Sequence, residues 1–276
     1  MSRATEQLER ILNIMARLRG PDGCAWDRGQ TSTSLRPYLV EEAFEVLGEL
    51  DRLDDGADPG ATALCEELGD LLFQIVFHAQ LAHERGAFDF GDVAQAISDK
   101  IERRHPQIFG DAPPCEGEAL ARQWAALKAE ERAARAGHPC SALDGVPEAA
   151  PALMRAERLT EKASRVGFDW RATAEVRAKL DEELSELDEA IAGGDQAAIE
   201  AELGDVLFTA VNLARFVGVH PEDALRGSIR RFSARFRHLE SALQRQGKKP
   251  SDLDLEALDA LWQEAKRALG AGGDER

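Results

Sequence analysis

An acidic signature that occurs twice, in the same order, most limits what this sequence can fold into. The first copy is Glu41-Glu42-x-x-Glu45 followed by Glu67-x-x-Asp70, and the second is Glu182-Glu183-x-x-Glu186 followed by Glu202-x-x-Asp205. In both copies the second part reads Glu-Leu-Gly-Asp before an apolar run. The interval between the copies covers about half of the chain, whereas solenoid repeats have periods of roughly 20–50 residues. The pattern therefore predicts a duplicated domain.

Composition favours an all-α fold for both copies. Hydrophobic residues make up 43% of the 276 residues, enough for packed cores, but aromatic residues only 6%. Because strands are enriched in aromatic and β-branched residues, a β-sandwich or barrel is disfavoured. Ala, Leu, Glu and Arg dominate and favour helices. We expect two tandem helical-bundle domains, 1–137 and 151–276, joined by a linker at 138–150.

Apolar spacing and turn signals place the helices of each half. They predict helices at about residues 5–19, 35–53, 61–85, 90–104, 118–136, 151–164, 174–191, 198–217, 221–246 and 255–269. The polar stretch from Thr31 to Ser34 is expected to cap the second of these. On the helix at 174–191 the glutamates of the signature share an arc of about 100°. The opposite side carries a predicted core stripe, Leu180, Leu184, Leu187 and Ile191.

Charge and cysteine usage narrow the partners and the compartment. The formal net charge is −17, whereas proteins that bind DNA or RNA through phosphate contacts are normally basic. Nucleic acid is therefore not an expected partner, although a nucleotide held through metal ions is compatible with this charge. The four cysteines form no C-x-x-C pair, and no stretch has the length of a membrane span. We expect a cytoplasmic protein that does not bind membranes.

Carboxylates one turn apart on two successive helices suit a hard divalent cation. Oxygen ligands favour Mg²⁺ or Mn²⁺ over zinc. A di-iron bundle would place His three residues after a ligand Glu, and the sequence has Glu45, Asp70, Glu186 and Asp205 at those positions. A solvated acidic face on each helix is the simpler alternative. The recurrence of the whole signature in the same order argues against this alternative. Because Mg²⁺ usually binds carboxylates together with substrate phosphates, the pattern indicates phosphoryl or nucleotidyl transfer.

The chain closely resembles the MazG family of nucleoside triphosphate pyrophosphohydrolases, in the tandem two-domain form and over nearly its whole length. Besides the acidic signatures, the resemblance rests on the runs 23–27, 97–106, 166–170 and 211–215. It implies an all-α homodimer that hydrolyses nucleoside triphosphates to nucleoside monophosphate and pyrophosphate. The reaction would need Mg²⁺, with Mn²⁺ as a substitute, and would have broad specificity for NTPs and dNTPs. Water would attack the α-phosphorus.

Residue roles also follow from this resemblance. The metal ligands carry over onto Glu183, Glu186, Glu202 and Asp205. Glu182 and Glu186 are both candidates for the carboxylate that takes the proton of the attacking water. The family's nucleotide site is lined by the counterparts of Lys179, Arg231, Arg235 and Trp262. A core or interface role for Trp262, and a solvated surface for the two arginines, remain alternatives.

The two halves differ at positions next to the acidic residues. Four residues before the metal-ligand glutamate lies Lys179 in the second half and Tyr38 in the first. Seven residues after the last aspartate lies Asn212 in the second half and Phe77 in the first. A cation and an amide suit a nucleotide better than two aromatic rings. We therefore predict catalysis by the C-terminal half, with an auxiliary or weakly active first set, Glu42, Glu45, Glu67 and Asp70.

Two other functions stay open at this stage. One is a narrow-specificity enzyme, acting on dUTP, dCTP or phosphoribosyl-ATP, because the motifs do not define the base pocket. The other is a non-catalytic regulator that binds a nucleotide through its acidic helices. The motifs also leave open the preferred nucleotide, the identity of the general base and the half that forms the dimer interface.

Overall fold

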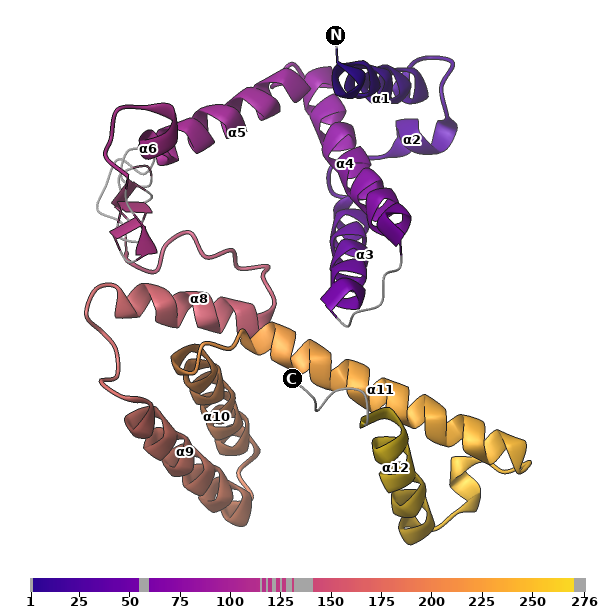
Figure 1. Ribbon diagram of the computed structural model, residues 1–276, viewed down its shortest axis with the longest axis vertical. Helices are drawn as coiled ribbons and strands as arrows, with labels where there is room; N and C mark the ends of the chain where they lie inside the picture. Colours follow the sequence, from indigo (N-terminus) through magenta and orange to yellow (C-terminus); the bar gives the residue numbers. More distant parts are fainter. Residues whose placement is uncertain are drawn as a thin grey trace. The chain divides into compact units, whose positions relative to one another are not determined.

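The chain forms helices that divide into two compact units (Figure 1). The computed structural model describes residues 2–54, 60–114 and 141–270, with scattered positions between 116 and 131. None of these residues forms a strand, so the all-α prediction is confirmed. Unit 1 covers residues 1–128 and unit 2 covers 129–276. Two predicted segments lie mainly or partly outside the described residues: most of the helix at 118–136, and residues 138–140 of the linker.

Unit 1 is built around a hairpin of two long helices. Its elements are α1 (Arg3–Arg19), α2 (Ala25–Gly29), α3 (Arg36–Asp54), α4 (Gly60–Glu84), α5 (Phe90–Arg104) and α6 (Pro106–Phe109). Helix α3 packs along α4, and α1 crosses the other side of α4 (Figure 1). The core cluster joins α1, the start of α3 and α4, through Met15, Leu35, Val76, Phe77 and Leu81. Burial of these side chains supplies the main driving force for packing α1 onto the hairpin.

Unit 2 repeats this hairpin. Its elements are α8 (Ala152–Ser164), α9 (Thr173–Gly193), α10 (Gln196–Phe216), α11 (Pro221–Arg245), a short 3₁₀ turn (Pro250–Asp252) and α12 (Leu255–Gly270). Helices α9 and α10 pack closely, α8 contacts α10 and α11, and α12 packs on α11 (Figure 1). The hairpin turns at Gly194, whose φ of 70° is a left-handed conformation that suits glycine. Asp195 then caps α10, because its side chain accepts a 3.0 Å bond from the Ala197 N–H.

The helix limits lie close to those predicted from the sequence, and the expected turn before α3 is present. The backbone N–H of Thr31 donates to Ser34 Oγ at 2.9 Å, and the N–H of Ser34 donates to Thr31 Oγ1 at 3.1 Å. These reciprocal bonds satisfy backbone groups ahead of the helix.

The predicted core stripe of α9 is wrong in part. Leu184 is 43% exposed and Ile191 is 56% exposed, whereas Val176 and the acidic Glu183 are buried. Helix α9 therefore turns Val176 and Glu183, and not Leu184 or Ile191, towards the interior of unit 2. Periodicity identified two opposite faces of the helix but did not determine which of them packs within the unit.

None of the described helices is long and apolar enough to cross a membrane. Cys24 and Cys65 are free and exposed. The other two cysteines, Cys115 and Cys140, lie outside the described residues.

Candidate metal centre and nucleotide pocket

Three carboxylates of the second signature converge between α9 and α10. One ligand oxygen each from Glu183, Glu186 and Glu202 lies within 4.8 Å of the others. The spacing of three residues puts the first two on one face of α9, and the close packing of the hairpin brings the third from α10. Glu183 is only 6% exposed. Such an all-oxygen set fits a hard divalent cation such as Mg²⁺ or Mn²⁺.

Electrostatics in this cluster favour a positive ligand. Desolvation raises the pKa of Glu186. The hydrogen bond to Glu183 and the negative charges of Glu183 and Glu202 raise this pKa further, whereas the positive charge of Lys179 lowers it. Carboxylates held this close repel one another when all are ionised. A dication between them would remove this repulsion, so the residues fit the metal that the sequence predicts.

Lys179 lies beside the same cluster, on α9. Its Nζ is 2.7 Å from Glu182 Oε1 and 3.1 Å from Glu183 Oε1. The hydrogen bonds to Glu182 and Glu183 raise the pKa of Lys179 well above its usual value, so the side chain stays protonated. Of the two candidate bases, Glu182 is thus ion-paired with Lys179, whereas Glu186 belongs to the carboxylate cluster.

A pocket of about 670 Å³ adjoins the carboxylates. It is lined by Leu143, Leu159, Thr160, Ala163, Gly167, Phe168, Asp169, Trp170, Lys179, Glu183, Asp205, Phe208, Thr209, Asn212 and Arg215. Four of the predicted site residues, Lys179, Glu183, Asp205 and Asn212, therefore share one pocket. Asp205 lies here and not in the tight group of three carboxylates. The lining of the pocket combines carboxylates, positively charged side chains and aromatic side chains, a composition that suits a nucleotide.

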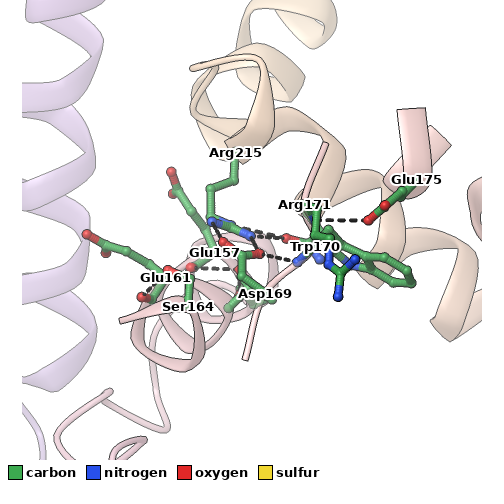
Figure 2. Close-up of polar contacts among 11 residues, drawn as sticks. Glu157, Glu161, Ser164, Asp169, Trp170, Arg171, Glu175 and Arg215 are labelled. Carbon is green, nitrogen blue, oxygen red and sulfur yellow. Dashed lines mark hydrogen bonds and ion pairs between the residues drawn. The ribbon is translucent and has the colours of Figure 1, made fainter. Parts of the chain in front are cut away.

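The loop between α8 and α9 forms one wall of this pocket and is tied to α10 (Figure 2). Arg215 binds Asp169 with both of its terminal nitrogens, at 2.5 Å and 3.1 Å. Asp169 Oδ1 also accepts a 2.9 Å bond from the N–H of Trp170, and Glu175 accepts one of 2.9 Å from the N–H of Arg171. These bonds hold the part of the loop that leads into α9, residues 169–171, in a defined position.

Three other predicted residues lie away from this pocket. Arg231 and Arg235 are on α11, and Trp262 on α12 packs against Phe232 with ring centroids 5.3 Å apart. Phe232 in turn stacks with Phe236 at 6.0 Å. Within this unit Trp262 therefore joins α12 to α11, in line with the packing alternative. Among the described residues that line the pocket, none of these three is included.

The first signature forms a similar cluster in unit 1. Ligand oxygens of Glu42, Glu67 and Asp70 lie within 4.8 Å of one another. Desolvation raises the pKa of Glu42 and that of Glu67, and Glu45 contributes through hydrogen bonds to both. However, the large pocket of this unit, about 690 Å³, is lined by residues of α1 and of the turn that follows it, and by none of these carboxylates.

The sequence interpretation missed part of the pocket. From the sequence, Asp169, Trp170 and Arg215 are only parts of the runs 166–170 and 211–215 that carry the family resemblance, without a predicted role in the site. Arg215 lies three residues after Asn212 on the same helix, and this spacing was the available signal. The pairing of Arg215 with Asp169, 46 residues earlier, has no local signature.

Comparison with known proteins places these features in a family. The MazG nucleotide pyrophosphohydrolase domain matches residues 30–109 and 171–240, one segment in each unit. Nucleoside triphosphate pyrophosphohydrolase from Escherichia coli strain K12 is 44% identical over 264 residues, 95% of this chain and 97% of the relative. Nucleoside triphosphate pyrophosphohydrolase/pyrophosphatase MazG from Thermotoga maritima is 43% identical over 275 residues, the full length of both chains. With a matching domain in both halves and full-length relatives at this identity, the chain belongs to the MazG nucleotide pyrophosphohydrolase family.

Proposed function

We propose that this protein is a hydrolase that converts nucleoside triphosphates to nucleoside monophosphate and pyrophosphate. Water attacks the α-phosphorus, Mg²⁺ or Mn²⁺ is the cofactor, and the range of NTPs and dNTPs is broad. One observation carries the proposal: Glu183, Glu186 and Glu202 converge within 4.8 Å beside a pocket that also contains Lys179. The names of the full-length relatives support the same activity.

The residues divide the chemistry between them. The bound cation would neutralise the triphosphate and lower the pKa of water. Glu183, Glu186, Glu202 and Asp205 hold it. Lys179 binds a phosphate oxygen, and Glu186, which lies in the carboxylate cluster beside the cation, accepts the proton of the attacking water. The aromatic side chains of the pocket, Phe168, Trp170 and Phe208, offer apolar surface to the base.

We place the reaction in the C-terminal half. There the pocket and the carboxylate cluster share Glu183, whereas the 690 Å³ pocket of unit 1 is lined by none of the carboxylates of the cluster in that unit. The N-terminal cluster of Glu42, Glu67 and Asp70 has an auxiliary role.

The protein acts as a homodimer in this proposal. The α9–α10 hairpin exposes Leu184 (43%), Ile191 (56%), Leu203 (47%) and Leu207 (53%). Large apolar side chains left exposed on one hairpin favour an interaction site, and a second copy would bury them. Light scattering coupled to size exclusion tests this, and a monomer at micromolar concentration would contradict it.

Product analysis tests the activity. The purified protein is incubated with each NTP and dNTP and Mg²⁺, and NMP plus pyrophosphate is separated from NDP plus phosphate. NMP and pyrophosphate in equal amounts, lost on addition of EDTA, are expected. NDP as the sole product rejects attack at the α-phosphorus. Turnover of only one nucleotide rejects broad specificity, and turnover of none favours a nucleotide-binding regulator.

A further inference from the structure

A hydrogen-bond network in the pocket fixes one side chain that faces the ligand space. Arg215 binds Asp169 through both terminal nitrogens, and its guanidinium lies 4.7 Å from the centre of the Phe216 ring. Its Nε and Nη2 also donate to Asn212 Oδ1, at 3.1 Å and 2.8 Å. Figure 2 shows that the pair of Arg215 and Asp169 belongs to a chain of contacts reaching Trp170 and Glu175. The arginine is therefore held on several sides.

This network determines which way the amide of Asn212 is turned. Arginine has only donors, so the atom of Asn212 that faces it must be the carbonyl oxygen. Two bonds occupy that oxygen and leave the NH₂ group as the polar part of the side chain available to a ligand. Among the hydrogen bonds of the described residues, none involves this NH₂ group, and Asn212 lines the pocket. Asn212 therefore presents a donor and not an acceptor to whatever occupies the pocket.

The position of this donor suits the base of a nucleotide. Asn212 comes seven residues after Asp205 on α10, a rise of about 10 Å along the same face. If the phosphates lie at the acidic end, the base extends towards Asn212, and Phe168 and Trp170 line the same pocket. Aromatic side chains beside a directed donor are a usual arrangement for binding a flat heterocycle.

We propose that the NH₂ group of Asn212 donates to an acceptor atom of the nucleotide base, and that Arg215 is the positioning residue that holds it in this orientation. The inference rests on the proposed function, because it assumes that a nucleoside triphosphate occupies this pocket. Unit 1 lacks the device: its counterparts are Phe77, which is fully buried, and Gln80. The donor is therefore a feature of the C-terminal half alone.

Asn212→Asp is the decisive variant because it separates the two roles of the side chain. The carboxylate still accepts both bonds from Arg215, so the network and the fold are kept, but the donor is lost. We expect about a tenfold rise in Kd for an α,β-methylene NTP analogue, measured by calorimetry, because one buried acceptor on the base loses its partner. We also expect KM to rise by a similar factor while kcat changes less than about threefold. Unchanged Kd and KM would mean that Asn212 serves only as a structural partner of Arg215, and would overturn the inference.

Ribose 5-triphosphate, which has no base, separates donor loss from the added negative charge. Repulsion of the triphosphate by Asp would weaken binding of this probe as much as that of the NTP analogue. Loss of a base contact would leave its affinity the same for the wild type and Asn212→Asp. Equal penalties on both ligands would overturn the assignment to the base. If the wild type binds neither ligand, the proposed function itself fails.

Arg215 is tested through its coupling to Asn212. Arg215→Met should raise the Kd of the NTP analogue by about threefold to tenfold, with little change for ribose 5-triphosphate. In the double variant the two penalties should not add, since Arg215 acts through Asn212. Additive penalties would remove the positioning role. Arg237→Met, at an exposed position of α11, is the matched control and should leave both affinities unchanged.

Discussion

Both units contain a bidentate arginine–carboxylate pair, but the two pairs have different neighbours. In unit 1, Arg19 of α1 binds Glu84 of α4 at 2.7 Å and 2.6 Å, and its guanidinium lies 5.5 Å from the centre of the Phe77 ring. In unit 2, Arg215 binds Asp169 and also donates to Asn212. Phe77 and Asn212 occupy equivalent positions after the last aspartate of each signature. The same type of pair thus supports a closed core in one unit and an open, polar pocket in the other.

The residues four positions before Glu42 and Glu183 also differ between the units, with an aromatic residue in unit 1 and a polar one in unit 2. Tyr38 packs edge-on against Trp26 with ring centroids 5.8 Å apart, whereas Lys179 pairs with Glu182 and Glu183. Both units keep a cluster of three carboxylates. A duplicated domain can therefore retain its acidic residues while the surrounding positions determine whether a substrate fits.

Neutralising one carboxylate in each half gives the strongest test of this comparison. Glu186→Gln removes a metal ligand and the proposed base, so we expect pyrophosphate release to fall on the order of 1,000-fold. Its counterpart Glu45→Gln should change the rate by less than about twofold. Steady-state assays with Mg²⁺ measure both. The reverse pattern, with activity lost in Glu45→Gln and kept in Glu186→Gln, would assign catalysis to the N-terminal half.

Truncating Phe77 tests whether unit 1 is closed at the position of Asn212. Phe77 is fully buried in the core cluster, so Phe77→Ala should cost about 3–5 kcal/mol of unfolding free energy for this unit. Urea denaturation followed by intrinsic fluorescence measures the loss. Hydrolysis under native conditions should stay near the wild-type rate. A large loss of activity with little loss of stability would indicate a substrate pocket in unit 1.

Replacing the cation of the second half should have a smaller effect than removing a metal ligand. In Lys179→Met, Glu182 and Glu183 lose their positive partner and the phosphates lose a charge, so we expect kcat/KM to fall about tenfold to 100-fold. Tyr38→Phe at the matching position of the first half should have no effect on hydrolysis. Equal effects of the two substitutions would remove the distinction drawn between the halves.

The smallest effect concerns pH and is expected in both halves. The pKa values of Glu186, Glu42 and Glu67 are raised above their ordinary 4.5. The folded state therefore binds protons more tightly than the unfolded state, and the metal-free protein should lose stability as pH rises from 4.5 through these pKa values. Glu84 and Glu161, whose pKa values are lowered, act in the opposite sense below pH 4.5.

Thermal unfolding with EDTA and with Mg²⁺ measures this effect. We expect Tm in EDTA to decline between pH 4.5 and neutrality, and the gain in Tm from Mg²⁺ to increase over the same window. Glu186→Gln should reduce this pH dependence through unit 2, and Glu42→Gln through unit 1. A Mg²⁺ gain that does not depend on pH would contradict binding of the cation by these carboxylates.

The acidic clusters could be predicted because their geometry is largely local. Glu183 and Glu186 must share a helix face at a spacing of three residues, and the short turn at Gly194 makes α10 the neighbour of α9. The helix limits follow from the same short-range signals. The exposed leucine stripe and the tie between Arg215 and Asp169 were not predictable in this way, because both depend on how separate segments pack.

Residue types and their spacing were enough to predict that the chain is helical and duplicated, that each half contains a carboxylate cluster, and that the halves differ at Lys179 and Asn212. These properties depend on residue type and on spacing within one or two turns of a helix. The packing of the helices was needed to show that Glu183 of α9 is buried in its own unit, that Asp205 and Asn212 share a pocket, and that Arg215 turns the amide of Asn212. Those outcomes depend on contacts between residues far apart in the chain, whose geometry no local spacing defines.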